Sequence, residues 1–291
     1  MKFLHFGDLH VWKLQLPPGE LLYPKRWLGP ANLLLRRAAK FPPEFRKPAL
    51  EAVGAEQPDL AVFTGDFTQS SLPSEFREVD ALFAPLRELL GDRLIALPGN
   101  HDVYTHRSRR RRILEQHLPW VQTEPVTRFD LTDRLTLVCV NHSEPFLLRS
   151  NGRVRPEAHA LLREVLTGCR DESRSILLAG HYPFASPPEA PEPADHKLLG
   201  DARFAAAVRE FEVALYLHGH QHHRWALRSP LAPKTLCLNC GSVSMRHPSP
   251  GRQAGFLTWT QLEDGRVEHL TAHTFDGAST WRKTPVTVRT L

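Results

Sequence analysis

The sequence lacks any run of apolar residues that approaches the length of about 18 needed to cross a membrane. Its first ten residues also lack the apolar core and the small-residue cleavage site of a signal peptide. Neither an internal repeat nor a low-complexity linker divides the chain. We therefore expect a single domain over residues 1–291, located in the cytoplasm.

Cysteine is scarce, with four residues in the whole chain. Cys237 and Cys240 form a Cys-x-x-Cys pair, but the surrounding sequence is typical of a β-strand, in which residues three apart point to opposite faces. The pair is thus poorly placed to share a metal, and we expect buried thiols, with a redox or zinc role as the alternative. A phosphate-binding loop of the form Gly-x4-Gly-Lys-Ser/Thr is absent too.

Proline and histidine, by contrast, are abundant. The chain has 25 prolines in 291 residues, which indicates many conformationally restricted loops. Its formal net charge of +5 is compatible with an anionic partner but too small to indicate nucleic acid. The 16 histidines matter through their positions, because most of the sequence motifs described below contain one.

Short apolar strands alternate with amphipathic helices through most of the chain. Strands are expected at 3–6, 60–64, 94–97, 135–140, 176–179 and 213–217, and helices at 46–56, 74–90 and 156–167, with Ser74 as the N-cap of the second helix. From about residue 254 the apolar residues alternate with period two, which predicts antiparallel strands. Together these patterns predict an α/β fold with mixed sheets.

Polar motifs come directly after five of the expected strands. They are Asp8-Leu9-His10, Gly65-Asp66, Gly99-Asn100-His101-Asp102, Gly180-His181 and Gly219-His220-Gln221-His222. Ligands in such sheets bind beyond the carboxyl ends of the strands, so these motifs are expected to converge. Each motif alone is weak evidence, but chance does not readily produce all of them in one chain, each at a strand end.

The residue types in these motifs suit metal ions. Three carboxylate or amide oxygens and four imidazoles, without a thiolate, favour Mn²⁺ or Fe, with Zn²⁺ as an alternative, over Mg²⁺ or Ca²⁺. Seven ligands are too many for one ion with an open position and about right for two. Two ions about 3.5–4 Å apart can activate a hydroxide held between them and stabilise the attacking and leaving oxygens of a phosphoester.

The order of the motifs, over residues 8–222, resembles the calcineurin-like metallophosphoesterases. The chain length and the opening sequence resemble the bacterial branch that includes class III cyclic-nucleotide phosphodiesterases. The resemblance implies a sandwich of two facing mixed β-sheets flanked by helices. It also implies a ligand set: Asp8, His10 and His222 for the first metal, Asn100, His181 and His220 for the second, and Asp66 bridging both.

The same resemblance implies that His101 is catalytic rather than a ligand. It would contact the phosphate or protonate the leaving oxygen, a role suited to an imidazole pKa near neutrality. In the protein-phosphatase branch an aspartate three residues after the bridging aspartate orients this histidine, but here that position is Gln69. His101 therefore needs another partner, either Asp102 or a backbone carbonyl, and a Ser/Thr protein phosphatase is disfavoured.

Two further residues are candidates for substrate contact. His142 follows an expected strand, with an ordinary loop residue as the alternative interpretation. Arg107 begins a cluster of five arginines that ends at Arg112; these could attract a phosphorylated substrate or simply form a solvated charged face. We expect His5 and His218, by contrast, to be core residues.

Residues 11–48 form a basic insert between the first two motifs. They contain eight Lys or Arg residues and two Glu residues, which gives a net charge of +6. Apolar residues from Trp27 to Ala38 recur at helical spacing. This pattern predicts a helix that caps the domain; the alternatives are a substrate lid and a contact with a lipid or anionic membrane surface.

We expect a dinuclear metal-dependent phosphoesterase that hydrolyses a small phosphodiester, such as a cyclic nucleotide. One alternative is a lipid-linked pyrophosphate or a phospholipid as substrate, by resemblance to the UDP-diacylglucosamine pyrophosphohydrolases. A DNA nuclease and an inactive scaffold on the same fold are the others; nucleic acid is the less expected partner because repair nucleases of this type usually carry further domains. The native metal pair, the substrate and the oligomeric state stay open.

Overall fold

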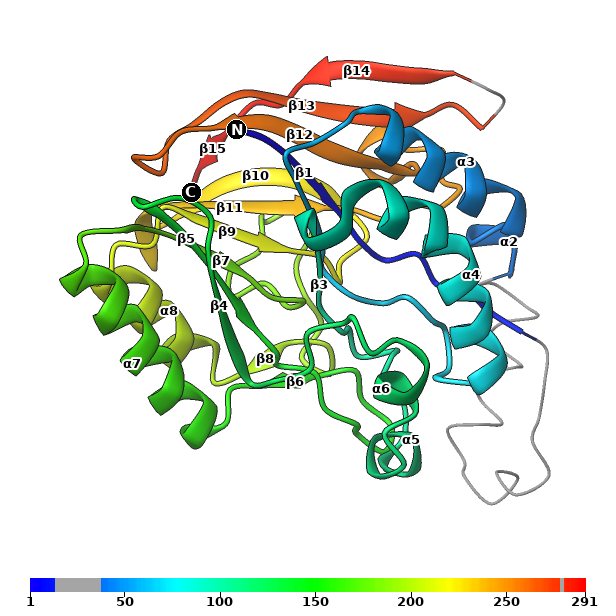
Figure 1. Ribbon diagram of the computed structural model, residues 1–291, viewed down its shortest axis with the longest axis horizontal. Coiled ribbons are helices and arrows are strands. Elements are labelled where there is room, and N and C mark those ends of the chain that lie inside the picture. Colours follow the sequence, from blue (N-terminus) through cyan, green and yellow to red (C-terminus); the bar gives the residue numbers. More distant parts are fainter. Residues whose placement is uncertain (14–37, 278–279) are drawn as a thin grey trace.

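Two mixed β-sheets lie face to face in the computed structural model, with helices on their outer faces (Figure 1). The structure describes residues 1–13, 38–277 and 280–291. The predicted fold class is confirmed. The helical stripe predicted from Trp27 lies almost wholly outside the described residues, and so does most of the basic insert.

The first sheet has six strands in the order β14-β13-β12-β1-β2-β3. Its parallel part is formed by β1 (Lys2–Phe6), β2 (Leu60–Phe63) and β3 (Leu94–Ala96). The antiparallel part is formed by β12 (Gly255–Gln261), β13 (Val267–Phe275) and β14 (Trp281–Pro285). The alternating tail therefore forms the antiparallel strands predicted for it.

The second sheet has seven strands in the order β15-β10-β11-β9-β7-β5-β4. Its parallel strands are β5 (Leu135–Val140), β7 (Ser175–Ala179), β9 (Leu215–His218) and β11 (Ala232–Cys240). The others are β4 (Val126–Asp130), β10 (Arg224–Ser229) and β15 (Arg289–Thr290). A separate small pair consists of β6 (Gly152–Arg153) and β8 (Leu198–Leu199).

Four helices cover the outer faces of the sheets (Figure 1). Helices α3 (Pro43–Ala55) and α4 (Pro73–Leu90) lie on the first sheet, and α7 (Pro156–Asp171) and α8 (Asp201–Glu210) lie on the second. Short helices are α2 (Ala38–Lys40), α5 (His106–Arg110) and α6 (Ile113–His117). No helix among the described residues combines the length and the apolar character that a membrane span requires.

The amino terminus of α4 differs from the prediction. Ser74 is not the N-cap, because the helix begins one residue earlier, at Pro73, after Leu72. The buried side chain of Glu75 accepts hydrogen bonds from the backbone N–H groups of Ser70 (2.9 Å) and Leu72 (3.1 Å). A glutamate within the first turn thus stabilises the donors before the helix, and proline at the first position needs none.

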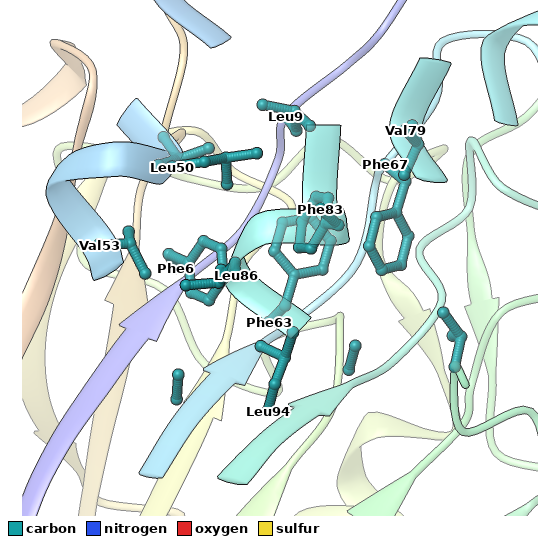
Figure 2. Close-up of a cluster of buried hydrophobic side chains, with 14 of the residues drawn as sticks. Phe6, Leu9, Leu50, Val53, Phe63, Phe67, Val79, Phe83, Leu86 and Leu94 are labelled. Atoms are coloured by element: carbon teal, nitrogen blue, oxygen red, sulfur yellow. The ribbon is translucent and has the colours of Figure 1, made fainter. Parts of the chain in front are cut away.

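Side-chain alternation along the central strands builds two separate cores on the first sheet. Phe3 of β1 and Val62 of β2 pack between the two sheets. Phe6 and Phe63, one position on, pack against α3 and α4 instead (Figure 2). There the Phe63 ring lies 5.4 Å from that of Phe83 of α4, edge to face.

The cysteine prediction is confirmed. All four cysteines, each within the described part of the chain, are buried free thiols. Cys237 and Cys240 both lie on β11, as the pattern predicted. Burial raises the pKa of Cys139 and Cys237 above the usual range, so these thiols are inert.

Candidate metal centre

The seven predicted ligands lie in loops that directly follow strands of both sheets. Asp8 and His10 follow β1, Asp66 follows β2, Asn100 follows β3, His181 follows β7, and His220 and His222 follow β9. Backbone hydrogen bonds join the first two loops: the Asp8 N–H donates to the Gly65 oxygen at 2.9 Å and the His10 N–H to the Asp66 oxygen at 3.0 Å. These loops therefore hold one another in place.

Five of the seven residues have left-handed backbone conformations. The φ angles are 54° for Asp8, 50° for His10, 60° for Asp66, 72° for His220 and 51° for His222. Residues other than glycine rarely adopt such angles, and their cost is tolerated where the surrounding structure enforces them, most often at functional sites. The strain is concentrated at the residues that the motifs singled out.

The first group of ligand atoms consists of Asp8, His10, Asp66 and His222. His10 Nε2 lies 2.8 Å from His222 Nε2, and His222 Nε2 lies 3.3 Å from Asp8 Oδ1. Asp66 Oδ2 lies 3.6 Å from His10 Nε2. Two carboxylates and two imidazoles that converge at these distances form a donor set suited to one transition-metal ion.

The second group consists of Asp66, His181 and His220. Asp66 Oδ2 lies 3.4 Å from His181 Nε2. The amide oxygen of Asn100 completes the group, at 3.1 Å from His181 Nε2 and 3.0 Å from His220 Nδ1. Asp66 belongs to both groups, which is what a bridging role requires. The assignment of each ligand to an ion stays a prediction.

Backbone carbonyls orient two of the imidazoles. His181 Nδ1 lies 2.7 Å from the Thr64 oxygen, and His220 Nε2 lies 3.0 Å from the His196 oxygen. When these nitrogens donate, the opposite nitrogen of each ring is left to bind a cation. This outer hydrogen bond is the usual way in which a protein selects the tautomer of a metal-binding histidine.

The electrostatics of the centre favour an ionised Asp66. Burial would raise the pKa of this carboxyl group, but the neighbouring imidazoles of His181 and His101 hold it well below its usual range. His181 opposes its own burial in the same way, because Asp66 raises its pKa to about 9. Protons and cations therefore compete for the same buried groups, and metal binding should release protons.

His101 borders the centre without joining either group of ligand atoms. Its backbone N–H donates to Asp66 Oδ1 at 2.8 Å, and its ring lies 4.9 Å from that of His10. Of the two partners weighed for its side chain, the carbonyl is present: His101 Nδ1 lies 2.7 Å from the backbone oxygen of Gln69. The substitution at position 69 therefore leaves the imidazole oriented by the main chain.

Asp102 has a structural position instead. Its carboxyl group accepts backbone N–H groups from Phe67, Thr68 and Gly99 at 2.9–3.2 Å. Burial, and then the charge of Asp66, raise the pKa of Asp102 to about 7. Asp102 thus ties the loop after β3 to the loop after β2, on which Asp66 and Gln69 lie.

Neither of the predicted substrate contacts lies within the two groups. His142 is 2% exposed and packs edge to face against Phe204 of α8, with ring centres 4.8 Å apart. Arg107 lies on α5, where the neighbouring Arg109 is 3.7 Å from Glu115. Their roles in substrate binding stay predictions, and the burial of His142 favours a structural role for its ring.

Sequence reasoning missed the buried ring of Phe41. Its centre lies 4.5 Å from the ring of His10 and 5.4 Å from that of His222. The Trp12 indole N–H donates to its backbone oxygen at 2.8 Å. Nothing in the sequence around Phe41 resembles a motif, because its role is to exclude water from the imidazoles. The described end of the basic insert thus forms one wall of the centre.

Gly99 is required by the close approach of two loops. A Cβ atom there would lie 2.1 Å from Asp66 Oδ1 and 2.4 Å from the Asp66 nitrogen. We expect Gly99→Ala to lower the free energy of unfolding by about 1–3 kcal/mol, as overpacking does, and to weaken metal binding by displacing Asp66. Urea unfolding and metal titration measure the two effects.

Gly168→Ala is the matched control for this prediction. Gly168 lies within α7, where an added Cβ would meet only the end of Arg128, at 3.6 Å. Alanine favours the helix here and should leave stability unchanged or raise it by up to about 1 kcal/mol. Equal stability changes in the two variants would contradict the steric argument.

The fold and the site define a dimetal phosphoesterase. A family model described as calcineurin-like phosphoesterase matches residues 1–224, about three-quarters of the chain. The chain therefore belongs to the calcineurin-like phosphoesterase family, as the motifs predicted.

Individual relatives extend this assignment. The chain is similar to the cAMP/cGMP dual specificity phosphodiesterase of Mycobacterium tuberculosis, with 28% identity over 167 residues, which cover 57% of this chain and about half (49%) of that protein. A dimetal phosphatase from Danio rerio has the same fold, with a TM-score of 0.62, 14% identity and coverage of 93% of this chain and 94% of that one. A purple acid phosphatase from yellow lupin seeds has a TM-score of 0.61 and 10% identity, covering 99% of this chain and 54% of that one.

Proposed function

We propose that the protein hydrolyses a small phosphodiester, such as a cyclic nucleotide, with two metal ions held through Asp66. The observation that carries the proposal is the pair of ligand groups that share this carboxylate, with His101 beside them. The similarity to a cAMP/cGMP phosphodiesterase supports a diester, although the alignment spans only part of each chain. Because all seven ligand residues are present and converge, the inactive scaffold is disfavoured.

The donor set fits such an ion pair. Asp8, His10 and His222 would hold one ion, Asn100, His181 and His220 the other, and Asp66 both. Mn²⁺ or Fe suits these nitrogen and oxygen ligands, with Zn²⁺ as the alternative. When bound, the ions activate water and offset the negative charge on the phosphoryl oxygens.

His101 supplies the proton in this proposal. Its Nδ1–H is held by the Gln69 oxygen, so Nε2 is the atom that exchanges a proton with the leaving oxygen. Asp66 and the Gln69 carbonyl both position the His101 side chain, one through its backbone N–H and the other through its ring. Phe41, on the side of His10, limits access of bulk water.

The proposal predicts a preference for diesters over monoesters. Purified protein loaded with Mn²⁺ should hydrolyse bis-p-nitrophenyl phosphate with a higher kcat/KM than p-nitrophenyl phosphate, and should cleave cAMP or cGMP. The measurement is a comparison of kcat/KM across these four substrates, repeated with Fe²⁺ and Zn²⁺. Efficient cleavage of the monoester with no turnover of any diester would reject the proposal.

A further inference from the structure

A pocket of about 310 Å³ lies beside His220, between the loop at 189–196 and the loop of the Gly-His-Gln-His motif. The two nitrogens of the His220 ring face different surroundings. Nδ1 lies 3.0 Å from Asn100 Oδ1 in the second ligand group, whereas Nε2 lies 3.0 Å from the backbone oxygen of His196, a residue that lines the pocket. One imidazole ring therefore separates the pocket from the metal centre.

Glu192 is the most unusual residue of this pocket. Its side chain is only 7% exposed, and its Oε1 atom lies 3.5 Å from His220 Nε2. Among the described residues nothing donates a hydrogen bond to this oxygen, and the proton of His220 Nε2 is directed to the His196 carbonyl instead. Buried polar groups in folded proteins nearly always have a partner, so a carboxyl group in this state calls for a donor from outside the chain.

The walls of the pocket are rigid before any ligand binds. Gln221 donates to Ser186 Oγ at 2.5 Å and accepts from the indole of Trp225 at 3.0 Å. Asn151 donates to the backbone oxygens of residues 194 and 197, and residues 183–193 include five prolines. A preformed wall of this kind lowers the entropic cost of binding and favours one ligand geometry.

We propose that this pocket binds the ribose of a nucleotide substrate, with the Glu192 carboxyl group accepting a hydrogen bond from the 2′-hydroxyl. The inference rests on the proposed function, because it assumes that the phosphate binds at the metal centre. Only a group attached directly to that phosphate can reach a pocket one imidazole ring away. In a nucleotide this group is the sugar, and a buried acidic side chain is a common partner of a ribose hydroxyl.

The recognition predicts discrimination between ribose and deoxyribose. AMP and 2′-deoxy-AMP should bind to the Mn²⁺-loaded protein with Kd values that differ by about 10- to 100-fold, the range expected for a hydrogen bond to a charged group. In Glu192→Ala the ratio of the two Kd values should fall to near one. Isothermal titration calorimetry measures this ratio, and a general change in metal binding or folding affects both ligands equally.

Asp195→Asn is the matched control, since Asp195 lies on the same loop but its side chain is 57% exposed and pairs with His196. This variant should keep the ratio of the wild type. A wild-type ratio near one, a ratio that survives in Glu192→Ala, or failure of both nucleotides to bind would each overturn the subsite. Discrimination by binding, together with no hydrolysis of any phosphodiester, would reject the proposed function and leave the subsite standing.

Discussion

Replacing Asp66 with alanine is expected to abolish the binding of both metal ions and to lower kcat/KM by about 10³-fold or more. The expectation follows from geometry, because the two groups of ligand atoms share only this residue. The ions supply several kcal/mol of transition-state stabilisation, and each 1.36 kcal/mol corresponds to a factor of ten in rate. Asp66 also accepts the backbone N–H of His101, so its loss releases the catalytic side chain as well.

Elemental analysis and turnover of bis-p-nitrophenyl phosphate test this variant. Asp80→Ala is the control, because Asp80 lies on α4, its side chain is 47% exposed and its partner is Arg87. The control should keep two ions per chain and the wild-type rate. An Asp66→Ala protein that retains both ions and full turnover would contradict the bridging role.

His101→Ala is expected to keep both metal ions and to lower turnover by about 10²–10⁴-fold, the usual contribution of a general acid. His101 touches Asp66 through its backbone N–H, which the substitution preserves. The defect should depend on the leaving group. A nitrophenolate departs without protonation, so the loss should be smaller for bis-p-nitrophenyl phosphate than for cAMP, whose leaving oxygen is an alkoxide.

The comparison of the two substrates decides between the roles implied for this histidine. An equal loss for both would indicate that His101 binds the phosphate rather than donates a proton. Loss of metal in the elemental analysis would instead make His101 a ligand. His117→Ala, on α6 and outside the metal centre, controls for nonspecific effects of removing an imidazole.

The fold could be predicted from the sequence because its central strands are short, apolar and punctuated by glycine. Burial on both faces makes β1 and β2 continuous apolar runs, and the loops after them begin with Gly7 and Gly65. Helix boundaries were less accessible. The start of α4 depends on how Glu75 folds back onto residues 70 and 72, and this contact has no distinct sequence pattern.

The same distinction applies to the site. The predicted ligands lie at strand ends, where local sequence determines their position, and the structure brings all seven together. Phe41 and Glu192 could not be found in this way, because each reaches the centre from a long loop whose course depends on distant contacts. The partner of His101 was only narrowed to two alternatives, since a backbone carbonyl leaves no trace in the sequence.

Anomalous diffraction from crystals of the Mn²⁺-loaded protein tests the central claim most directly. The account predicts two peaks per chain, about 3.5–4 Å apart, with an oxygen of Asp66 within bonding distance of both. It also predicts Asn100 beside one peak and Asp8 beside the other. A single peak, or an Asp66 carboxylate turned away from either ion, would contradict it.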